Sequence, residues 1–170
     1  GNHRGRKGST FEGGMRVPMI IAGPGIAANQ QLTNAFAFVT DITPTILALT
    51  GVKPAPARYG GRLVEPLIGR SLMPLLQGTA ETVYQAHESI GHELMGHGAL
   101  FMGDYKIVFN RGTQGDNQWR LFDIVADPGE TEDLSTKNPA QLQLMLARYQ
   151  QYIEENNVLP MPEGYRFESQ

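Results

Sequence analysis

The 170-residue sequence predicts an α/β chain whose second half is a small antiparallel sheet packed by a C-terminal helix. In the first half, two apolar runs of strand length precede one short amphipathic helix, which is typical of an α/β domain. In the second half, three strand-like runs follow one another across turns, and a long amphipathic helix comes after them. We expect a first part over residues 1–82 and a second part over residues 83–170.

The first half is expected to begin with a loop, followed by two strands and a helix. Five of the first 14 residues are glycine, which predicts a loop. The apolar runs Met15–Ala22 and Ala35–Thr40 predict the two strands. The helix is expected to begin near Ile42, with Asp41 as its N-cap, and to end at Gly51 in a left-handed C-cap.

Three runs in the second half have the aromatic and β-branched content of strands. They are His97–Met102, Tyr105–Phe109 and Gln118–Ile124. The two-residue connection Gly103–Asp104 predicts a hairpin between the first two runs. Because glycine comes first in this connection, a type II′ turn is expected and not a type I′ turn.

The final helix has a clear start signal in Asn138, Pro139 and Gln141, which suit the N-cap, N1 and N3 positions. An apolar stripe follows at helical spacing: Leu142, Leu146, Tyr149 and Ile153. Such a stripe predicts that the helix lays one face on an apolar surface, and the preceding sheet is the expected surface.

Composition and charge exclude several classes of protein. Lys and Arg number 14 against 17 Asp and Glu, for a formal net charge of -3, whereas a nucleic-acid surface needs an excess of basic residues. No apolar run approaches the roughly 18–20 residues of a membrane span. The absence of cysteine excludes disulfides, thiolate metal sites and a cysteine nucleophile. We therefore expect neither a nucleic-acid partner nor a membrane partner.

Three histidines, His87, His92 and His97, lie in the segment HESIGHELMGH. A zincin-type helix needs two histidines four positions apart on one face, but here the spacing is five, twice. On a strand, a spacing of five places successive side chains on opposite faces. We therefore expect no metal site here, and hydrogen-bonded imidazoles at a strand edge are the favoured interpretation.

The N-terminal loop is the strongest candidate for chemistry, because Lys7 lies among glycines that allow close backbone approach to a ligand. A lysine ammonium is a compact charge with three donors, which suits a tetrahedral oxyanion such as sulfate or phosphate. The phosphate-binding Walker pattern is absent, since Gly8 and not Ser or Thr follows Lys7. A solvated basic arm is the alternative that the composition leaves open.

The segment KGSTFEGGMRVPMIIAGPG, which begins at Lys7, resembles a stretch of the type I sulfatases, a family of the alkaline phosphatase superfamily, in which a lysine precedes E-G-G-x-R-V-P and a strand. Four further segments resemble family motifs in the same order: FVTDITPTILALTGV, GRSLMPLLQG, LFMGDYKIV and WRLFDIVADPGETEDL. The chain is thus similar to the C-terminal part of a bacterial arylsulfatase-like enzyme. The resemblance implies the C-terminal portion of an alkaline-phosphatase-like sulfatase fold.

The resemblance also implies cofactors that the chain itself does not carry. The family forms a formylglycine nucleophile from a C/S-x-P-x-R motif and binds a divalent cation, expected to be calcium, through ligands that include a D-N-G run. Neither motif is present in this sequence. Nucleophile and metal ligands are therefore expected in a missing N-terminal part. Bacterial relatives occur in the periplasm and in the cytoplasm, so the compartment stays open.

Residue by residue, the resemblance assigns Lys7 as the catalytic and substrate-binding lysine that holds a sulfate oxygen. Thr10 and His3 are weaker candidates for contact with the substrate. Glu12 and Arg16 are expected to anchor the loop, either by pairing with each other or by binding its backbone.

The expected function is hydrolysis of sulfate esters, with aryl sulfates as the expected small-molecule substrates. One alternative is a hydrolase of the same superfamily that acts on phosphoesters or phosphonates. The other is a non-catalytic chain that binds a sulfated ligand or serves as a scaffold. The 170-residue chain alone is expected to be inactive, and exposed strand edges are expected to make it self-associate.

Overall fold

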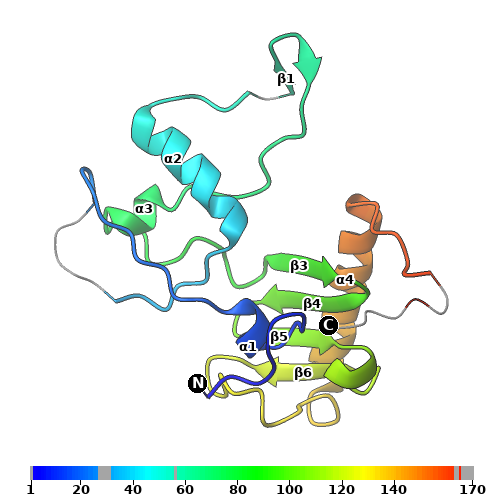
Figure 1. Ribbon diagram of the computed structural model, residues 1–170. Coiled ribbons are helices and arrows are strands. Elements are labelled where there is room, and N and C mark those ends of the chain that lie inside the picture. The colour runs from blue at the N-terminus through cyan, green and yellow to red at the C-terminus, as the bar shows by residue number, and fades with distance from the viewer. Residues whose placement is uncertain (1, 27–31, 56, 163–164, 166–170) are drawn as a thin grey trace. The chain divides into compact units, whose positions relative to one another are not determined.

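A computed structural model describes residues 2–26, 32–55, 57–162 and 165 (Figure 1). The chain divides into two compact units: Gly1–Pro18 with Ala86–Gln170, and Met19–Gln85. The N-terminal loop therefore belongs to the same unit as the C-terminal sheet. The expected division between residues 82 and 83 concerns domains of a longer fold and stays a prediction.

The first unit is built on an antiparallel sheet of four strands in the order β3-β4-β5-β6 (Figure 1). The strands are β3 (Ser89–Leu94), β4 (His97–Met102), β5 (Tyr105–Phe109) and β6 (Trp119–Asp123). The three predicted strands are confirmed as β4, β5 and β6. The edge strand β3 was not predicted, although the histidine-rich segment had been placed beside a strand edge.

Two tight hairpins set the register of the sheet. Met102 pairs with Tyr105 across the β4–β5 connection, and Gly103 has a φ of 58°. Since Asp104 is not among the residues with positive φ, the turn has the predicted type II′ pattern. The β3–β4 turn differs, because Met95 and Gly96 both have positive φ, at 53° and 79°, which is typical of type I′.

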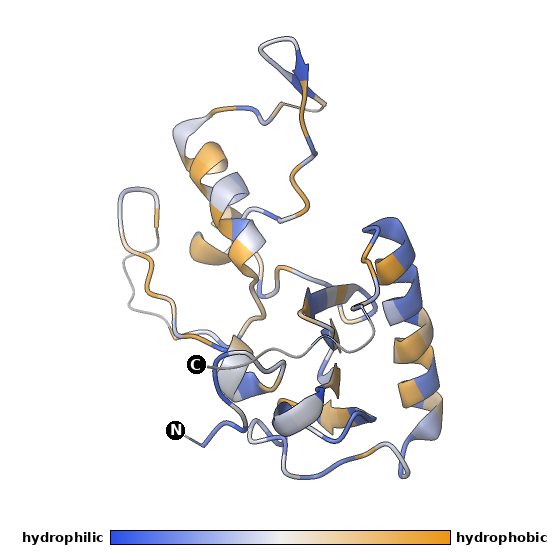
Figure 2. Cartoon of the chain, turned by 45° about the vertical axis from the view of Figure 1, so that its right-hand side comes forward, coloured by the Kyte–Doolittle hydropathy of each residue, from blue (hydrophilic) through white to orange (hydrophobic). Residues whose placement is uncertain are grey.

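One face of the sheet is covered by α4 (Pro139–Glu155). The helix begins as predicted, because the side-chain oxygen of Asn138 accepts a hydrogen bond from the backbone N–H of Gln141 at 3.3 Å. Apolar and polar residues both occur along α4 (Figure 2). Its apolar stripe packs on the sheet in one cluster, whose buried members are Leu100, Met102, Ile107, Leu121, Met145 and Tyr149.

The opposite face of the sheet is covered by the N-terminal loop and the single helical turn α1 (Glu12–Met15) (Figure 1). Phe11 packs there in a second cluster with Ala99, Val108 and Phe122. The ring of Phe11 meets that of Phe122 edge to face, with centroids 6.3 Å apart. Both faces of this small sheet are therefore buried.

The two strands predicted in the first half, Met15–Ala22 and Ala35–Thr40, are wrong. The chain leaves α1 after Met15 and runs to residue 22 without ladder pairing, and the second run leads into the short 3₁₀ helix η1 (Val39–Asp41). A strand needs a neighbour to accept and donate its backbone hydrogen bonds, and no strand among the described residues pairs with either run. Ile20 is accordingly 94% exposed.

The second unit contains the predicted helix as α2 (Ile42–Thr50), and Gly51 forms its left-handed C-cap with a φ of 71°. Asp41 occupies the N-cap position of α2, as predicted, but its side chain makes no capping hydrogen bond there. Its carboxylate instead accepts hydrogen bonds from the backbone N–H groups of Phe38 at 2.7 Å and Arg70 at 2.8 Å. Asp41 therefore fixes the entry to α2 by joining it to a distant loop.

The remaining elements are short. They are α3 (Met73–Leu76), the two-residue strands β1 (Arg58–Tyr59) and β2 (Arg62–Leu63), and the 3₁₀ helix η2 (Gly112–Gln114). Within the described part of the chain, no helix combines the length and the apolar character that a bilayer crossing requires.

Candidate functional site

Lys7 lies at the exposed tip of a tight turn formed by Arg6, Lys7, Gly8 and Ser9. The backbone N–H of Ser9 donates to the carbonyl oxygen of Arg6 at 3.0 Å, and the Ser9 hydroxyl donates to the same oxygen at 2.9 Å. Gly8 has a φ of 91°, as the third residue of a type II turn requires. The turn thus explains why a glycine follows Lys7. Lys7 itself lies on a short loop that is closed by hydrogen bonds.

The two glycines of the EGG segment allow the loop to fold back against α1. The backbone N–H of Gly13 donates to the carbonyl oxygen of Arg4 at 2.7 Å. A Cβ atom on Gly13 would lie 2.6 Å from the carbonyl oxygens of Arg4 and Gly5, and one on Gly14 would lie 2.7 Å from that of Arg6. Any larger residue would push the two arms of the loop apart.

Thr10 attaches the loop to the sheet. Its backbone N–H donates to the side-chain oxygen of Asn110 at 2.9 Å, and its hydroxyl donates to the carbonyl oxygen of Gly98 at 3.0 Å. Thr10 is fully buried, whereas Lys7 is exposed. The structure therefore places Thr10 beneath the loop, on the side that contacts the sheet.

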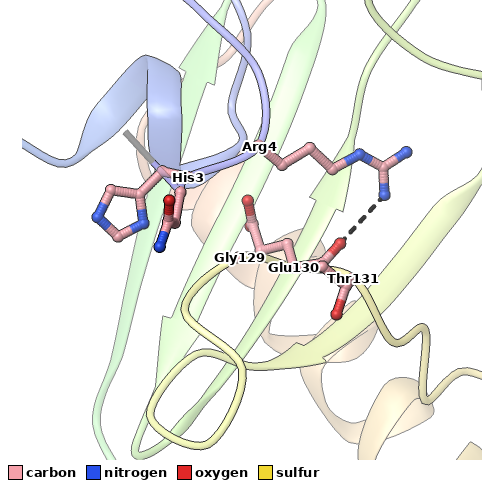
Figure 3. Close-up of a pocket in the computed structure, with 6 residues that line it drawn as sticks. His3, Arg4, Gly129, Glu130 and Thr131 are labelled. Atoms are coloured by element: carbon pink, nitrogen blue, oxygen red, sulfur yellow. Dashed lines mark hydrogen bonds between the residues drawn. The ribbon is translucent and has the colours of Figure 1, made fainter.

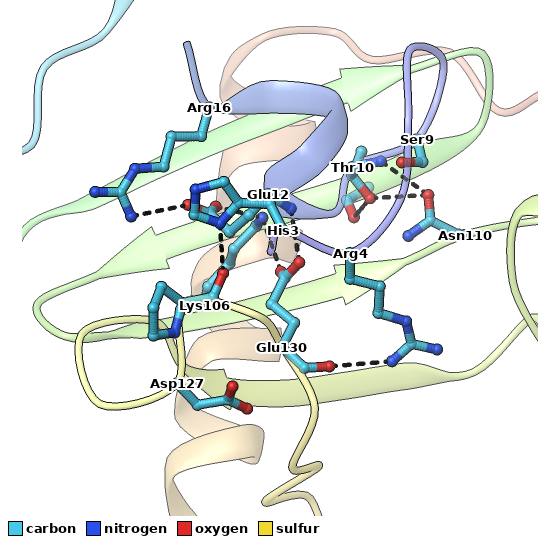
Figure 4. A network of polar contacts seen from close by, with 12 residues as sticks. His3, Arg4, Ser9, Thr10, Glu12, Arg16, Lys106, Asn110, Asp127 and Glu130 are labelled. Atoms are coloured by element: carbon cyan, nitrogen blue, oxygen red, sulfur yellow. Dashed lines mark hydrogen bonds and ion pairs between the residues drawn. The ribbon is translucent and has the colours of Figure 1, made fainter. Parts of the chain in front are cut away.

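Glu12 belongs to a buried group of three charges with Lys106 of β5 and Glu130 (Figure 4). The Lys106 ammonium lies 2.8 Å from a carboxylate oxygen of Glu12 and 3.0 Å from one of Glu130. Arg16 approaches the other oxygen of Glu12 at 3.8 Å from a half-exposed position. Burial raises the pKa of Glu130, although the ammonium beside it works in the opposite direction.

Glu130 reaches this position from a turn after β6. The backbone N–H of Glu130 donates to the carbonyl oxygen of Asp127 at 3.0 Å, and Glu130 has a φ of 53°. Sequence reasoning missed both Lys106 and Glu130, because neither belongs to a local motif for chemistry. The only available signal was a lysine within an apolar strand run, where a charge needs a partner.

His3 and Arg4 lie on the other arm of the loop, beside the turn that carries Glu130 (Figure 3). His3 donates through Nδ1 to the carbonyl oxygen of Pro128 at 2.8 Å. The guanidinium of Arg4 donates to the carbonyl oxygen of Glu130 at 3.3 Å and stacks on Phe11, 4.2 Å from the ring centroid. A shallow pocket of about 440 Å³ lies here and is lined by Asn2, His3, Arg4, Gly129, Glu130 and Thr131.

The surface of the loop is strongly basic. The first 16 residues contain four Lys and Arg residues and one acidic residue, and that acidic residue, Glu12, is buried against Lys106. No hydrogen bond or ion pair joins the Lys7 ammonium to any residue that the structure describes. This arrangement leaves a positive charge on a fixed turn, which is suited to binding an anion.

The histidine-rich segment forms β3 and its flanks. Burial lowers the pKa of His92 and of His97, and the Nδ1 atom of His97 accepts the backbone N–H of Arg111 at 3.0 Å. Across the described ranges, no group of three His, Cys, Asp or Glu side chains is placed to hold a metal ion.

Comparison with known proteins identifies relatives over most of the chain. A family model described as N-sulphoglucosamine sulphohydrolase, C-terminal, matches residues 5–157. An uncharacterised sulfatase of Schizosaccharomyces pombe is 30% identical over 160 residues, which is 94% of this chain and 28% of that protein. Arylsulfatase K of Canis lupus familiaris is 33% identical over 78% of this chain and 25% of its own length.

A choline-sulfatase of Rhizobium meliloti is 34% identical over 76% of this chain and 23% of its own length. The chain thus spans about a quarter of the length of these curated relatives.

Two solved structures share the fold. The structure of Ps i-CgsB in complex with k-i-k-neocarrahexaose matches 95% of this chain and 34% of its own, with a TM-score of 0.71 and 25% identity. A Bacteroides thetaiotaomicron structure from work on the metabolism of glycosaminoglycans matches 89% of this chain and 32% of its own, with a TM-score of 0.66 and 21% identity.

Proposed function

Because the chain belongs to the sulfatase family and forms its C-terminal part, we propose that the complete protein hydrolyses sulfate esters and that Lys7 binds the sulfate group. The predicted fold class, the C-terminal portion of a sulfatase fold, is confirmed by the matching structures. The observation that carries the functional proposal is the exposed ammonium of Lys7 on a closed, anchored turn.

Lys7 has the chemistry that the reaction needs at this point. Breaking the S–O bond of a sulfate ester places negative charge on the leaving oxygen and on the sulfate, and a fixed ammonium stabilises that charge. A single oriented donor of this kind accounts for roughly 10²–10³ in rate. The turn between Arg6 and Ser9 holds the backbone of Lys7, which limits the region that its ammonium can reach.

The other residues of the loop have supporting roles in this proposal. His3, beside the shallow pocket, contacts the part of the ester that leaves. Thr10 holds the loop on the sheet, because its hydroxyl already donates to Gly98. Glu12 and Arg16 anchor the loop, an assignment supported by their 3.8 Å contact.

The formylglycine nucleophile and the divalent cation, expected to be calcium, belong to other parts of the complete protein in this proposal. Among the described residues, no group of three His, Cys, Asp or Glu side chains is placed to hold a metal ion. The contribution of this chain is therefore to bind and orient the sulfate group.

The test compares Lys7→Ala with wild type in the complete protein, with an aryl sulfate as the probe substrate. The variant is expected to lower kcat/KM by about 100-fold or more. Lys53→Ala, which removes an exposed lysine from the second unit, is the matched control and is expected to leave the rate unchanged. A Lys7→Ala rate within about threefold of wild type would refute the proposal.

A second measurement separates this activity from that of a phosphoester hydrolase. The complete protein is expected to hydrolyse an aryl sulfate faster than the corresponding aryl phosphate. The reverse preference would assign it to the phosphoester alternative, and failure to hydrolyse either ester would favour the non-catalytic one.

A further inference from the structure

The buried charges beneath the loop have no direct part in the proposed chemistry, yet they lie where the loop meets the sheet. We propose that Lys106 is a positioning residue for Lys7: together with Glu12 and Glu130 it forms an ion triad that fixes the catalytic loop. This inference rests on the proposed function of Lys7.

Each carboxylate oxygen of the triad faces a cationic or N–H group. One oxygen of Glu12 accepts from Lys106 at 2.8 Å, and its other oxygen faces Arg16 at 3.8 Å. One oxygen of Glu130 accepts from Lys106 at 3.0 Å, and its other oxygen accepts from the backbone N–H of Glu12 at 2.6 Å. The Lys106 ammonium also lies 5.0 Å from the centroid of the Phe101 ring. Every carboxylate oxygen therefore has a cationic or N–H partner.

Three separate segments converge at this point. Lys106 comes from β5, Glu12 from α1, 94 positions away, and Glu130 from the turn after β6, 24 positions away. Figure 4 shows Glu12, Lys106 and Glu130 close to one another, although they come from different elements. Glu12 of α1 and Glu130 must both contact the Lys106 ammonium at the same time. This double contact restricts the position of α1 on the sheet.

Stability alone does not account for the triad. Burying three charged groups costs desolvation free energy, and apolar residues of similar size often stabilise a core equally well. Glu130 also adopts a left-handed backbone conformation with a φ of 53°, which is uncommon for a residue with a side chain. The ions restrict how α1 can be placed on the sheet. Apolar side chains can shift past one another at little cost, whereas two carboxylates bound to one ammonium cannot.

The placement of Glu12 is transmitted to Lys7 through the closed loop. The backbone N–H of Gly13, next to Glu12, donates to Arg4 at 2.7 Å, and the Arg6–Ser9 turn closes with two hydrogen bonds to one carbonyl oxygen. Four residues separate Glu12 from Lys7. Of these, Ser9 closes the turn and Thr10 is hydrogen-bonded to Asn110 and Gly98. A shift of Glu12 therefore moves the ammonium of Lys7.

The closing experiment is a double-mutant cycle in the complete protein. Glu130→Gln keeps the shape of the side chain and removes its charge. In the presence of Lys7, this variant is expected to lower kcat on an aryl sulfate by about tenfold, with KM changed by less than about twofold. In a Lys7→Ala background, it is expected to lower the residual kcat by less than about twofold.

Equal losses in both backgrounds would overturn the inference, because a general structural defect acts whether or not Lys7 is present. If Lys7→Ala itself leaves the rate unchanged, the proposed function of Lys7 is refuted. The positioning role of Lys106 is then refuted as well, because it concerns the placement of Lys7 for the reaction. Lys137→Met is the matched control, since it breaks an exposed Lys137–Glu132 ion pair in the same unit, and its kcat is expected to equal that of wild type.

A second measurement reports the loop position without turnover. Native-state trypsin digestion of the complete protein, followed by mass spectrometry, measures cleavage after Arg6 and Lys7. Lys106→Met and Glu130→Gln are expected to increase cleavage there by about tenfold, with unchanged cleavage after Arg148, an exposed residue of α4. Unchanged cleavage after Arg6 and Lys7 would overturn the positioning role. This result separates failure of the triad inference from failure of the sulfate-binding proposal.

Discussion

The backbone N–H of Thr10 donates to the carboxamide oxygen of Asn110 at 2.9 Å, and this bond joins positions 100 residues apart in the sequence. The hydroxyl of Thr10 donates to the same oxygen at 3.2 Å and to the carbonyl oxygen of Gly98 at 3.0 Å. One threonine thus connects the N-terminal loop to β4 and to the residue that follows β5. The loop is held from below by neutral hydrogen bonds as well as by the ion triad.

Replacing Thr10 by valine is expected to lower the free energy of unfolding of this chain by about 1–2 kcal/mol, because it removes the buried hydrogen bond from the Thr10 hydroxyl to the carbonyl oxygen of Gly98. Urea denaturation followed by circular dichroism measures the change. Thr113→Val, at an exposed site in η2, is expected to change stability by less than about 0.5 kcal/mol. Equal effects at the two sites would contradict the anchoring role of Thr10.

Gly14→Ala is expected to destabilise the chain more strongly, by about 3 kcal/mol or more, because the added Cβ would lie 2.7 Å from the carbonyl oxygen of Arg6. Gly112→Ala is a suitable control. Gly112 has a positive φ, of 57°, but no atom lies within 4 Å of the position that an added Cβ would occupy, so a loss of about 1 kcal/mol is expected. A smaller effect at Gly14 than at Gly112 would show that the loop does not pack as described.

The stability of the chain is expected to fall in acid through Asp133. Burial raises the pKa of this carboxyl, but hydrogen bonds from Ser135 and Arg120 outweigh it and lower the pKa of Asp133 to about 2. Since the unfolded-state pKa is about 3.9, the stabilisation is present above about pH 4 and is lost as the pH falls to about 2. The contribution is about 2 kcal/mol.

Urea denaturation at pH 5, 3 and 2 tests this expectation. Asp133→Asn is expected to lower the free energy of unfolding at pH 5. It is also expected to reduce the fall of that free energy between pH 5 and pH 2. Asp104→Asn, at an exposed site in the β4–β5 turn, is expected to leave the pH dependence as in wild type. An unchanged pH dependence in Asp133→Asn would refute the assignment.

The chain alone is expected to self-associate, because apolar side chains are exposed in both units. Val17 is 78% exposed and Ile46 of α2 is 55% exposed. Contacts between copies would bury such side chains. Light scattering over a concentration series is expected to show a rising mass, and Ile20→Glu with Ile46→Glu is expected to lower it. A constant monomer mass at high concentration would contradict this prediction.

The purified chain is also expected to show no turnover of an aryl sulfate, with or without added calcium. The proposal assigns the nucleophile and metal ligands to other parts of the protein, and Lys7 supplies only sulfate binding and charge stabilisation. Calcium-dependent turnover by the chain itself would contradict that division of roles. The complete protein under the same conditions is the positive control.

The helices and strands that could be predicted depend on residues close together in the sequence. The N-cap of α4 is formed by Asn138 and its own first turn, and the β4–β5 hairpin depends on Gly103. The β3–β4 turn was missed because Met95 in a left-handed conformation is not a common turn signal. Met15–Ala22 was wrongly predicted as a strand because apolar content indicates burial, whereas a strand also needs a partner outside the segment.

The contrast between local signals and contacts with distant segments also explains which residues of the candidate site could be predicted. Lys7 could be found because glycines surround it in the sequence and because the segment resembles a known family. The contacts of Thr10 with the sheet, and those of Lys106 and Glu130 beneath the loop, could not be predicted in this way. Their contacts depend on three segments that are distant in the sequence but adjacent in space, and no local pattern in the sequence indicates that proximity.

The membership of the N-terminal loop in the same unit as the distant sheet has a consequence for biosynthesis. A ribosome produces the Lys7 turn long before β5 and the Glu130 turn emerge from the exit tunnel. Until then the aromatic ring of Phe11 lacks the strands against which it packs, and the Glu12 carboxylate lacks its contact with Lys106. The N-terminal loop can therefore fold onto the sheet only after β5 and the Glu130 turn have been synthesised, and products that end before them carry the basic loop without the sheet that holds it.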